Sequence, residues 1–173
     1  IPNNYYSNGG VSMSTLKVDA LQDTSGNTLS RVAQVVQATK QDVQSTTSTS
    51  YVDITGMSVN ITPTSSSSKI LLTGLVVIHH SLYTAFLRIL RDSTEIGKPS
   101  GSNSAYIVYN HNANSNQSRA IELLDSPNTT SQVTYKMQFK RDGGSTLYIN
   151  AHTTGTTSDY ISTSVLTATE ILQ

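Results

Sequence analysis

The sequence predicts an all-β protein, an antiparallel β-sandwich preceded by an extended N-terminal arm. Apolar and polar residues alternate over several short segments, most clearly over residues 132–140. Roughly eight or nine such segments follow one another at the spacing of about 8–12 residues that is typical of sandwiches and jelly rolls. No segment combines helical periodicity with capping residues, and no longer internal repeat is visible. These observations favour a sandwich over a helical or α/β fold.

Composition limits the classes of partner and chemistry. The chain has 173 residues and no Cys, so it is long enough for a sizeable core but has no disulfides or thiolate metal sites. Lys plus Arg and Asp plus Glu both number 11, and charged residues make up 13%, against about 25% in typical proteins. No basic cluster indicates nucleic-acid binding, and no apolar run reaches the ~18–20 residues that would insert into a membrane.

We expect residues 1–30 to form the arm and residues 31–173 the sandwich. Residues 1–12 lack hydrophobic periodicity. The neighbouring Tyr5 and Tyr6 are interpreted as anchors that dock on another protein, and a disordered end is the alternative.

The rest of the arm, residues 14–30, is too sparse in apolar residues to form its own core. Leu16 and Val18 are two of its few apolar positions. We expect this segment to add a strand elsewhere or to wind around neighbouring subunits, so Leu16 and Val18 join Tyr5 and Tyr6 as predicted partner-binding residues.

The first two strands of the sandwich are predicted with different patterns. Residues 31–41 are ambiguous between helix and strand, and their valines favour a strand. Residues 44–50 read as a Ser/Thr loop. In the strand 51–61, the apolar residues change parity on either side of Gly56. A β-bulge of one extra residue at Gly56 would return both sets to the same face.

Residues 69–80 predict an unusual strand, because nearly every position between Ile70 and Ile78 is apolar. Such a strand needs apolar cover on both faces. In an antiparallel protein the second cover is either another sheet layer or another subunit, and we favour a subunit.

The remaining strands follow from alternation and turn signals. They are predicted at 84–91, about 105–109, 118–124, 132–140, 147–151 and 160–172. Residues 91–97 are predicted to form a hairpin turn. The glycines within 141–145 predict a second hairpin that pairs 132–140 with 147–151.

No pattern of catalytic or metal-binding residues appears. The four histidines lack metal-site spacing, and most carboxylates lie at predicted turns. Two carboxylates that meet in space remain the alternative that would support glycoside hydrolysis. No nucleophile-elbow or nucleotide-binding motif is present. We expect no enzymatic activity, no catalytic residue, no metal and no cofactor.

One polar, aromatic stretch is a candidate for weak carbohydrate binding, because Tyr rings stack on sugars while Asn amides hydrogen-bond to hydroxyls. An ordinary Asn-rich turn is the alternative. The candidate glycan-binding residues are Tyr106, Tyr109, Asn110, His111 and Asn112.

Several sequence segments together resemble the small virion structural proteins of tailed phages, especially those of aquatic and cyanobacterial phages. The resemblance covers residues 14–172. It is carried by the following phrases: Ser14-Thr15-Leu16-Lys17-Val18-Asp19-Ala20-Leu21-Gln22-Asp23, Ser48-Thr49-Ser50-Tyr51-Val52-Asp53-Ile54-Thr55-Gly56, Ile61-Thr62-Pro63, Ser68-Lys69-Ile70-Leu71, Leu90-Arg91-Asp92-Ser93-Thr94-Glu95-Ile96-Gly97, Leu124-Asp125-Ser126-Pro127 and Leu166-Thr167-Ala168-Thr169-Glu170-Ile171.

This resemblance implies a trimeric, tumour-necrosis-factor-like jelly roll located in the virion, and it carries over no catalytic residue. The expected function is a homotrimeric decoration (cement) protein that clamps the capsid shell through its arm, with the major capsid protein or another virion protein as partner. The alternative is a tail or head fibre module that binds a host surface glycan.

Overall fold

The computed structural model describes residues 24–26, 31–80, 83–100, 106–111, 115–144, 146–151 and 161–173. The chain divides into two units, Ile1–Ser30 and Arg31–Gln173. In the first unit, residues 24–26 form a turn in which Gly26 has a φ of 83°. The predicted contacts of the arm lie outside the described residues, so they stay predictions.

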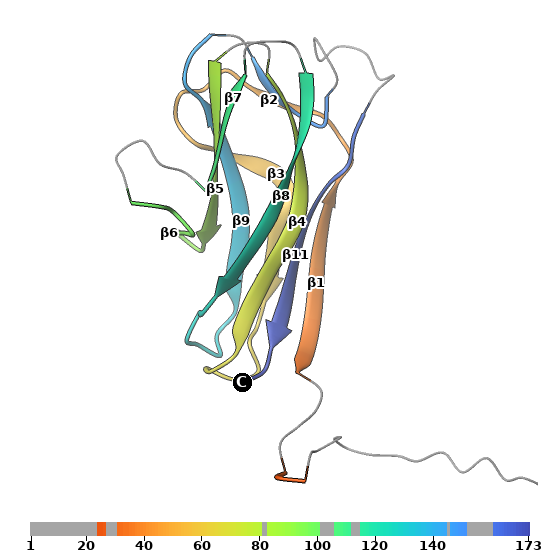
Figure 1. The fold of residues 1–173 in the computed structure, drawn as a ribbon, viewed down its shortest axis with the longest axis vertical. Helices are drawn as coiled ribbons and strands as arrows, with labels where there is room; N and C mark the ends of the chain where they lie inside the picture. The colour runs from red at the N-terminus through yellow and green to blue at the C-terminus, as the bar shows by residue number, and fades with distance from the viewer. Residues whose placement is uncertain are drawn as a thin grey trace, which may run out of the picture. The chain divides into compact units, whose positions relative to one another are not determined.

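Every regular element in the described part of the second unit is a β-strand (Figure 1). The strands are β1 (Val32–Lys40), β2 (Gln44–Thr46), β3 (Val52–Ile61), β4 (Lys69–His80), β5 (Tyr83–Arg91), β6 (Thr94–Ile96), β7 (Ile107–His111), β8 (Ser115–Asp125), β9 (Val133–Arg141), β10 (Leu147–Ile149) and β11 (Ser164–Ile171).

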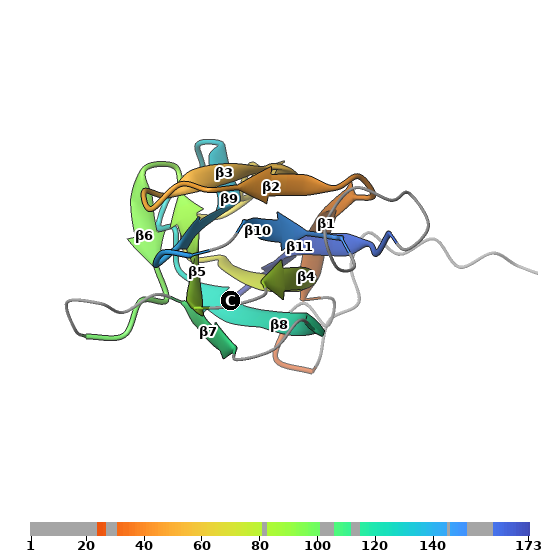
Figure 2. The ribbon, with the colours of Figure 1, turned by 90° about the horizontal axis from the view of Figure 1, so that it is seen from above.

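Two antiparallel sheets pack face to face (Figure 2). In the described residues, the first sheet has the order β1-β11-β4-β10-β2, with β8 also paired to β4. The second sheet has the order β3-β9-β5-β6, with β7 also paired to β5. The long-range pairs β1/β11, β3/β9, β4/β8 and β5/β7 nest inside one another along the chain and fall alternately in the two sheets. This nesting defines a jelly roll and confirms the predicted fold class.

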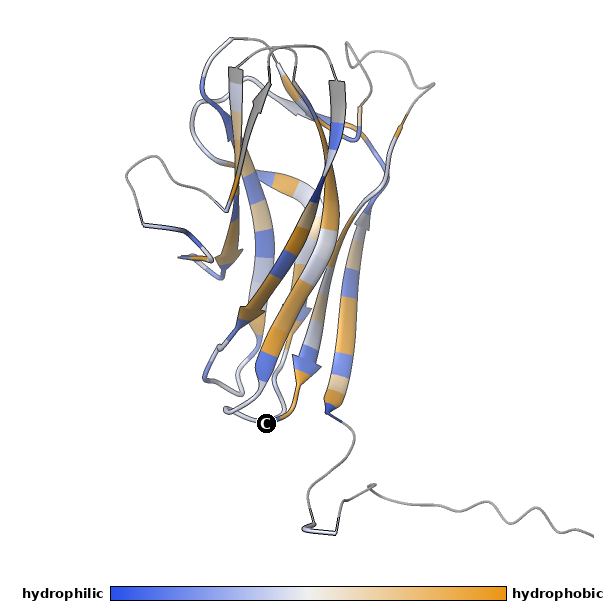
Figure 3. Cartoon of the chain, in the orientation of Figure 1, coloured by the Kyte–Doolittle hydropathy of each residue, from blue (hydrophilic) through white to orange (hydrophobic). Residues whose placement is uncertain are grey.

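The core forms because alternate side chains of each strand point between the sheets. Strand β9 alternates regularly between buried and half-buried positions, which is visible as alternating hydropathy bands in Figure 3. The expected inward residues of β9 are all buried, as are those on one side of β5. These residues are Val133, Tyr135, Met137, Phe139, Ala85, Leu87 and Ile89.

One polar cluster in the core joins the two sheets. The fully buried Tyr135 of β9 donates its hydroxyl to Asp125 Oδ2 at the end of β8, at 2.7 Å. Arg91 at the end of β5 binds both oxygens of the same carboxylate, at 2.7 and 2.9 Å. Burial, together with the neighbouring Asp125 carboxylate, raises the pKa of Tyr135 far above its ordinary value, so its hydroxyl stays a donor.

The predicted bulge at Gly56 exists but is larger than expected. Gly56 has a φ of 83°, and Ile54 and Met57 both face the core as predicted. Asp53 pairs with Gln138 and Ser58 with Lys136, so the five steps along β3 match two along β9 and three residues are extra, not one.

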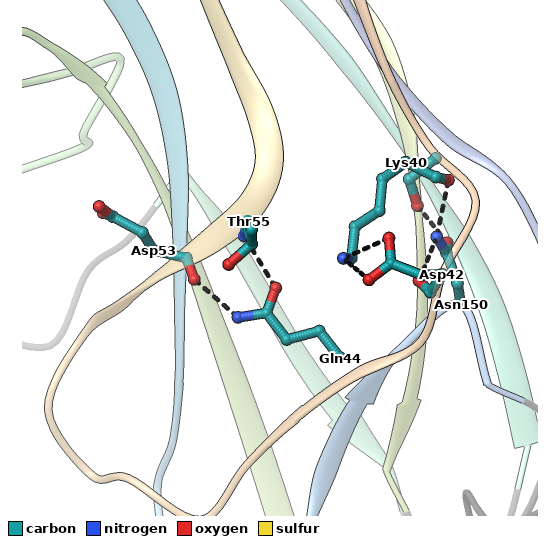
Figure 4. Close-up of polar contacts among 7 residues, drawn as sticks. Lys40, Asp42, Gln44, Asp53, Thr55 and Asn150 are labelled. Carbon is teal, nitrogen blue, oxygen red and sulfur yellow. Dashed lines mark hydrogen bonds and ion pairs between the residues drawn. The ribbon is translucent and has the colours of Figure 1, made fainter.

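The bulge is tolerated because a side chain satisfies the backbone groups that it frees. Gln44 of β2 donates to the Asp53 carbonyl and accepts from the Thr55 amide, both at 2.8 Å (Figure 4). Residues 44–46, predicted as part of a loop, form a short strand instead. The Gln44 side chain of this strand takes up the backbone hydrogen bonds that the bulge in β3 leaves free.

The predicted hairpin of 132–140 with 147–151 is wrong. Strand β10 pairs with β4 and β2 in the first sheet, whereas β9 lies in the second. The glycines still turn the chain with positive φ, but they carry it from one sheet to the other. The predicted hairpin at 91–97 is confirmed, because β5 pairs with β6 around Asp92.

Candidate assembly interface

The outer face of the first sheet carries four of the five exposed large apolar residues among the described residues, Val32, Val35, Leu75 and Leu124. Strands β1, β11, β4 and β8 lie side by side there, and their registers align side chains into rows. Two rows of this face are mainly apolar, and a polar row separates them. The apolar rows are Val35, Thr169, Leu71 and Leu124, and then Thr39, Val165, Leu75 and Ala120; the polar row is Gln37, Thr167, Thr73 and Glu122.

The large apolar side chains of these rows remain in contact with solvent. Val35 is 59% exposed, Leu124 56% and Leu75 36%. Val32, which pairs with Ile171 at the start of β1, is exposed as well. Exposed apolar residues are ordinary when they are scattered, but contiguous ones mark interaction surfaces. We name the outward side chains of β1, β11, β4 and the Ser118–Leu124 part of β8 the apolar face; Figure 3 shows apolar bands along β1, β4 and β8.

Strand β4 explains why this face exists. Its inward residues Ile70, Leu72, Val76 and Ile78 are fully buried in the core. Its outward residues divide into two halves: Val77 and His79 are buried within the chain, whereas Leu71 and Leu75 are not. The doubly apolar pattern therefore has two explanations, because one half is covered by the chain and the other half is open.

Gly74 lies within the open half of β4, one residue before the last pair with β11. Beyond Leu75, which pairs with Val165, β4 changes partner from β11 to β10, which it meets at the Ile78–Ile149 pair. A Cβ atom at Gly74 would lie 2.2 Å from the Val165 carbonyl oxygen, which is closer than atoms can approach. Glycine is required because the β11 backbone passes directly against it.

A buried carboxylate fixes the lower end of the apolar face. Glu170 of β11 is fully buried and accepts hydrogen bonds from Gln34 Nε2 (2.6 Å), Ser68 Oγ (2.7 Å), Thr64 N (2.7 Å) and Thr64 Oγ1 (2.8 Å). Burial tends to raise the pKa of Glu170, but these four donors outweigh it and lower the pKa to about 2. They tie β1 and the β3–β4 loop to β11.

A second polar cluster fixes the upper end (Figure 4). Asn150, with a φ of 63°, donates to the Lys40 carbonyl at 2.8 Å and accepts from Ser164 Oγ at 2.6 Å. The Val77 amide in turn donates to Ser164 Oγ at 3.0 Å. The buried Lys40 ammonium binds the exposed Asp42 carboxylate at 2.9 Å, and this hydrogen bond lowers the pKa of Asp42. Side-chain hydrogen bonds thus link the strands of the apolar face to neighbouring segments at both ends.

The predicted glycan-binding residues fall into three groups. Asn112 lies outside the described residues, while Tyr109, Asn110 and His111 belong to β7, which pairs with β5. The fifth residue, Tyr106, donates its hydroxyl to the Glu122 carbonyl at 2.6 Å and accepts from the Glu122 amide at 2.9 Å. Its hydroxyl is therefore used to hold β8, and glycan binding by this set stays a prediction.

The arm residues Tyr5, Tyr6, Leu16 and Val18 all lie outside the described residues. Among the described residues, no three His, Cys, Asp or Glu side chains gather as metal ligands. No described helix is long and apolar enough to cross a membrane.

Sequence reasoning did not single out Val35, Leu124 or Ala120. Their signal was an apolar residue at the outward position of a half-buried strand, which is weak in any one strand. The residues become a surface only when the register aligns four strands.

Comparisons with known proteins leave the family open. No protein-family model matches the chain, and a search of curated proteins finds no match. Solved structures with some likeness include three of infectious bursal disease virus. These are its viral particle (TM-score 0.42, 8% identity, 84% of this chain and 38% of that chain), its VP2 subviral particle (0.42, 16%, 91% and 42%) and the virus of its Gx strain (0.41, 13%, 90% and 43%). This chain thus spans about two fifths of the length of those proteins. Because the TM-scores are low, no inference about this chain rests on the likeness.

Proposed function

We propose that this protein is a structural component of a virus particle that assembles through the apolar face of its first sheet. The exposed rows around Val35, Leu75 and Leu124 carry this proposal, since a soluble domain rarely leaves such a surface uncovered. The jelly-roll order of the strands and the sequence resemblance to tailed-phage virion proteins support it.

The finer proposal is a homotrimeric decoration protein of a tailed phage. Three copies would meet through the apolar face, and the arm, with Tyr5, Tyr6, Leu16 and Val18, would clamp the capsid shell by adding to a neighbouring protein. The sequence resemblance, which implies a trimeric jelly roll, is the reason for proposing three subunits. A non-enzymatic role agrees with the described carboxylates, of which Asp42, Asp53, Asp125 and Glu170 each take part in a structural contact.

Sedimentation velocity of the purified chain at micromolar concentration tests the assembly. A trimer supports the proposal, and a well-folded monomer would contradict it. Electron cryomicroscopy of the intact particle then separates the two roles: density on the capsid shell supports decoration, and density on the tail supports the fibre alternative.

Deletion of residues 1–30 tests the clamp. Trimers should persist while binding to undecorated capsids is lost. Capsid binding by the truncated trimer at the level of the full chain would show that the arm is not the clamp.

The second candidate function is a fibre module that binds a host surface glycan. The observation that favours it is the position of β7, which carries Tyr109, Asn110 and His111 beside β5 in the second sheet. A glycan array probed with the intact protein tests this function, and an array without any hit would contradict it.

A further inference from the structure

The outer face of the second sheet, on the side away from the core, holds a cluster of cations and aromatic rings. Lys140 of β9 pairs with Phe86 of β5, and Arg88 of β5 pairs with Gln138 of β9. Tyr51 lies just before β3 at the same level. We name Tyr51, Phe86, Arg88, Gln138 and Lys140 the cation–aromatic patch.

Lys140 is held by rings and not by a carboxylate. Its Nζ lies 4.9 Å from the centre of the Tyr51 ring and 5.0 Å from the centre of the Phe86 ring. Among the described residues, no Asp or Glu forms an ion pair with it. Aromatic faces attract an ammonium but accept none of its strong hydrogen bonds. The Lys140 donors are therefore positioned and available to a ligand.

The other cations of this face are already partly neutralised. Arg88 stacks over Tyr51 at 4.1 Å from the ring centre, donates from Nε to Gln138 at 2.7 Å and contacts Glu95 at 3.5 Å. Lys136 binds Asp53 at 3.0 Å. Lys140 is thus the cation of this face with the least local compensation, which makes it the natural centre for an anion.

We propose that the cation–aromatic patch binds a carboxylate-bearing sugar of an acidic surface polysaccharide. The Lys140 ammonium would bind the sugar carboxylate by charge-assisted hydrogen bonds, and the Tyr51 and Phe86 rings would contact its carbon skeleton. Strand β7, which carries the predicted glycan residues Tyr109 and Asn110, pairs with β5 beside Phe86. The site is independent of the trimer, because it uses the opposite sheet from the apolar face.

Calorimetric titration of the full chain with short oligomers of alginate, a polymer of uronate sugars, tests the proposal. Neutral dextran oligomers and dextran sulfate are the two comparison ligands. Alginate should bind and dextran should not, and binding of alginate should exceed that of dextran sulfate. Absence of alginate binding, or equal binding of dextran, would overturn the proposal. Stronger binding of dextran sulfate would overturn the carboxylate assignment.

Matched charge variants on this face distinguish a site from general attraction. Lys140→Gln should weaken alginate binding about tenfold or more, as expected for loss of a charge-assisted bond. Lys136→Gln removes the same charge from a cation that already has a partner, and should weaken binding less than about threefold. Equal losses in the two variants would overturn the proposal.

Lys140→Arg keeps the cation and should retain most of the binding, which guards against a general effect of substitution. Thermal unfolding of each variant, expected within a few degrees of the parent because the position is on the surface, confirms that the fold is intact.

Discussion

The two outer faces of the sandwich have the same strand geometry but different chemistry. On the first sheet the outward residues are largely Val, Leu and Thr, and the ionisable ones among the described outward positions of β1, β4, β8 and β11 are Lys69, Glu122 and the buried His79. On the second sheet they include Arg88, Lys136 and Lys140 together with Asp53. Alternation alone requires only that one side of each strand be apolar. The outward residues are not constrained by the core, so their chemistry reflects what that face contacts.

The difference indicates opposite fates for the two faces. Covering a face of aligned apolar rows with another protein surface is favourable, because it removes apolar area from water. A face of cations, rings and amides keeps its charges hydrated. Covering it with an apolar partner would be unfavourable, because the charges would be desolvated. The comparison therefore agrees with the proposal that the first sheet meets a partner and the second faces the outside of the assembly.

Aspartate substitutions on the apolar face should have the largest effect. In the proposed trimer, Leu124→Asp or Leu75→Asp would bury a carboxylate without a cation, so each should weaken association by about 100-fold or more. Sedimentation velocity across a dilution series measures the shift. Far-ultraviolet circular dichroism should stay unchanged, because both side chains already contact solvent in the isolated chain.

The matched control lies on the other sheet. Ser58 is exposed on β3, and Ser58→Asp should leave association unchanged while adding the same charge. If Ser58→Asp and Leu124→Asp disrupt the oligomer equally, net charge and not the apolar face controls assembly, and the comparison between the faces fails.

Much of the fold could be predicted because its signals are local. Alternation located β3, β5 and β9, and the valines correctly favoured a strand at β1. The apolar pattern of β4 correctly predicted a strand, and its outer face is covered within the chain at Val77 and His79, while cover of the rest by a subunit stays a prediction. The wrong hairpin at β9 and β10 had a correct local signal too, since Gly143 and Gly144 do turn the chain. A turn does not record which sheet the chain enters next, because that depends on all the other strands.

The candidate sites were harder to predict for the same reason. Leu124 and Val35 are about ninety residues apart in the chain, and only the registers through β11 and β4 place them in one row. Lys140 and Tyr51 are equally distant in sequence, and no spacing rule joins a Lys to a Tyr across a sheet. Tyr106 shows the converse: its aromatic, Asn-rich setting suggested a ligand, whereas its hydroxyl holds the β8 backbone.

Glu170→Gln should have the next largest effect, on stability and not on chemistry at either face. The ordinary pKa of this carboxyl is 4.5 and the folded pKa is lowered to about 2. A depressed folded pKa stabilises the protein above pH 4.5, and that contribution is lost as the pH falls through about 2. At neutral pH the variant should lose about 3 kcal/mol of unfolding free energy.

Urea unfolding of both proteins at pH 7, 4 and 2.5 measures this effect. The difference between parent and Glu170→Gln should be largest at pH 7 and should shrink toward pH 2.5. A constant difference across the series would mean that the hydrogen-bond geometry, and not the charge of Glu170, provides the stabilisation.

Asp53→Asn should have the smallest effect on stability and yet the sharpest meaning for the comparison. The hydrogen bond from Gln138, opposed by burial and aided by Lys136, lowers the pKa of Asp53. Its side chain is 54% exposed, so the ion pair with Lys136 is screened and the unfolding free energy should change by no more than about 0.5 kcal/mol.

The substitution also removes a carboxylate from the face that carries Lys140, so alginate binding should rise about twofold. A rise in binding with unchanged stability and unchanged association would show that the charges of the second sheet serve a ligand. A fall in binding would mean that Asp53 itself holds the ligand, and the role assigned to Lys140 would then need another explanation.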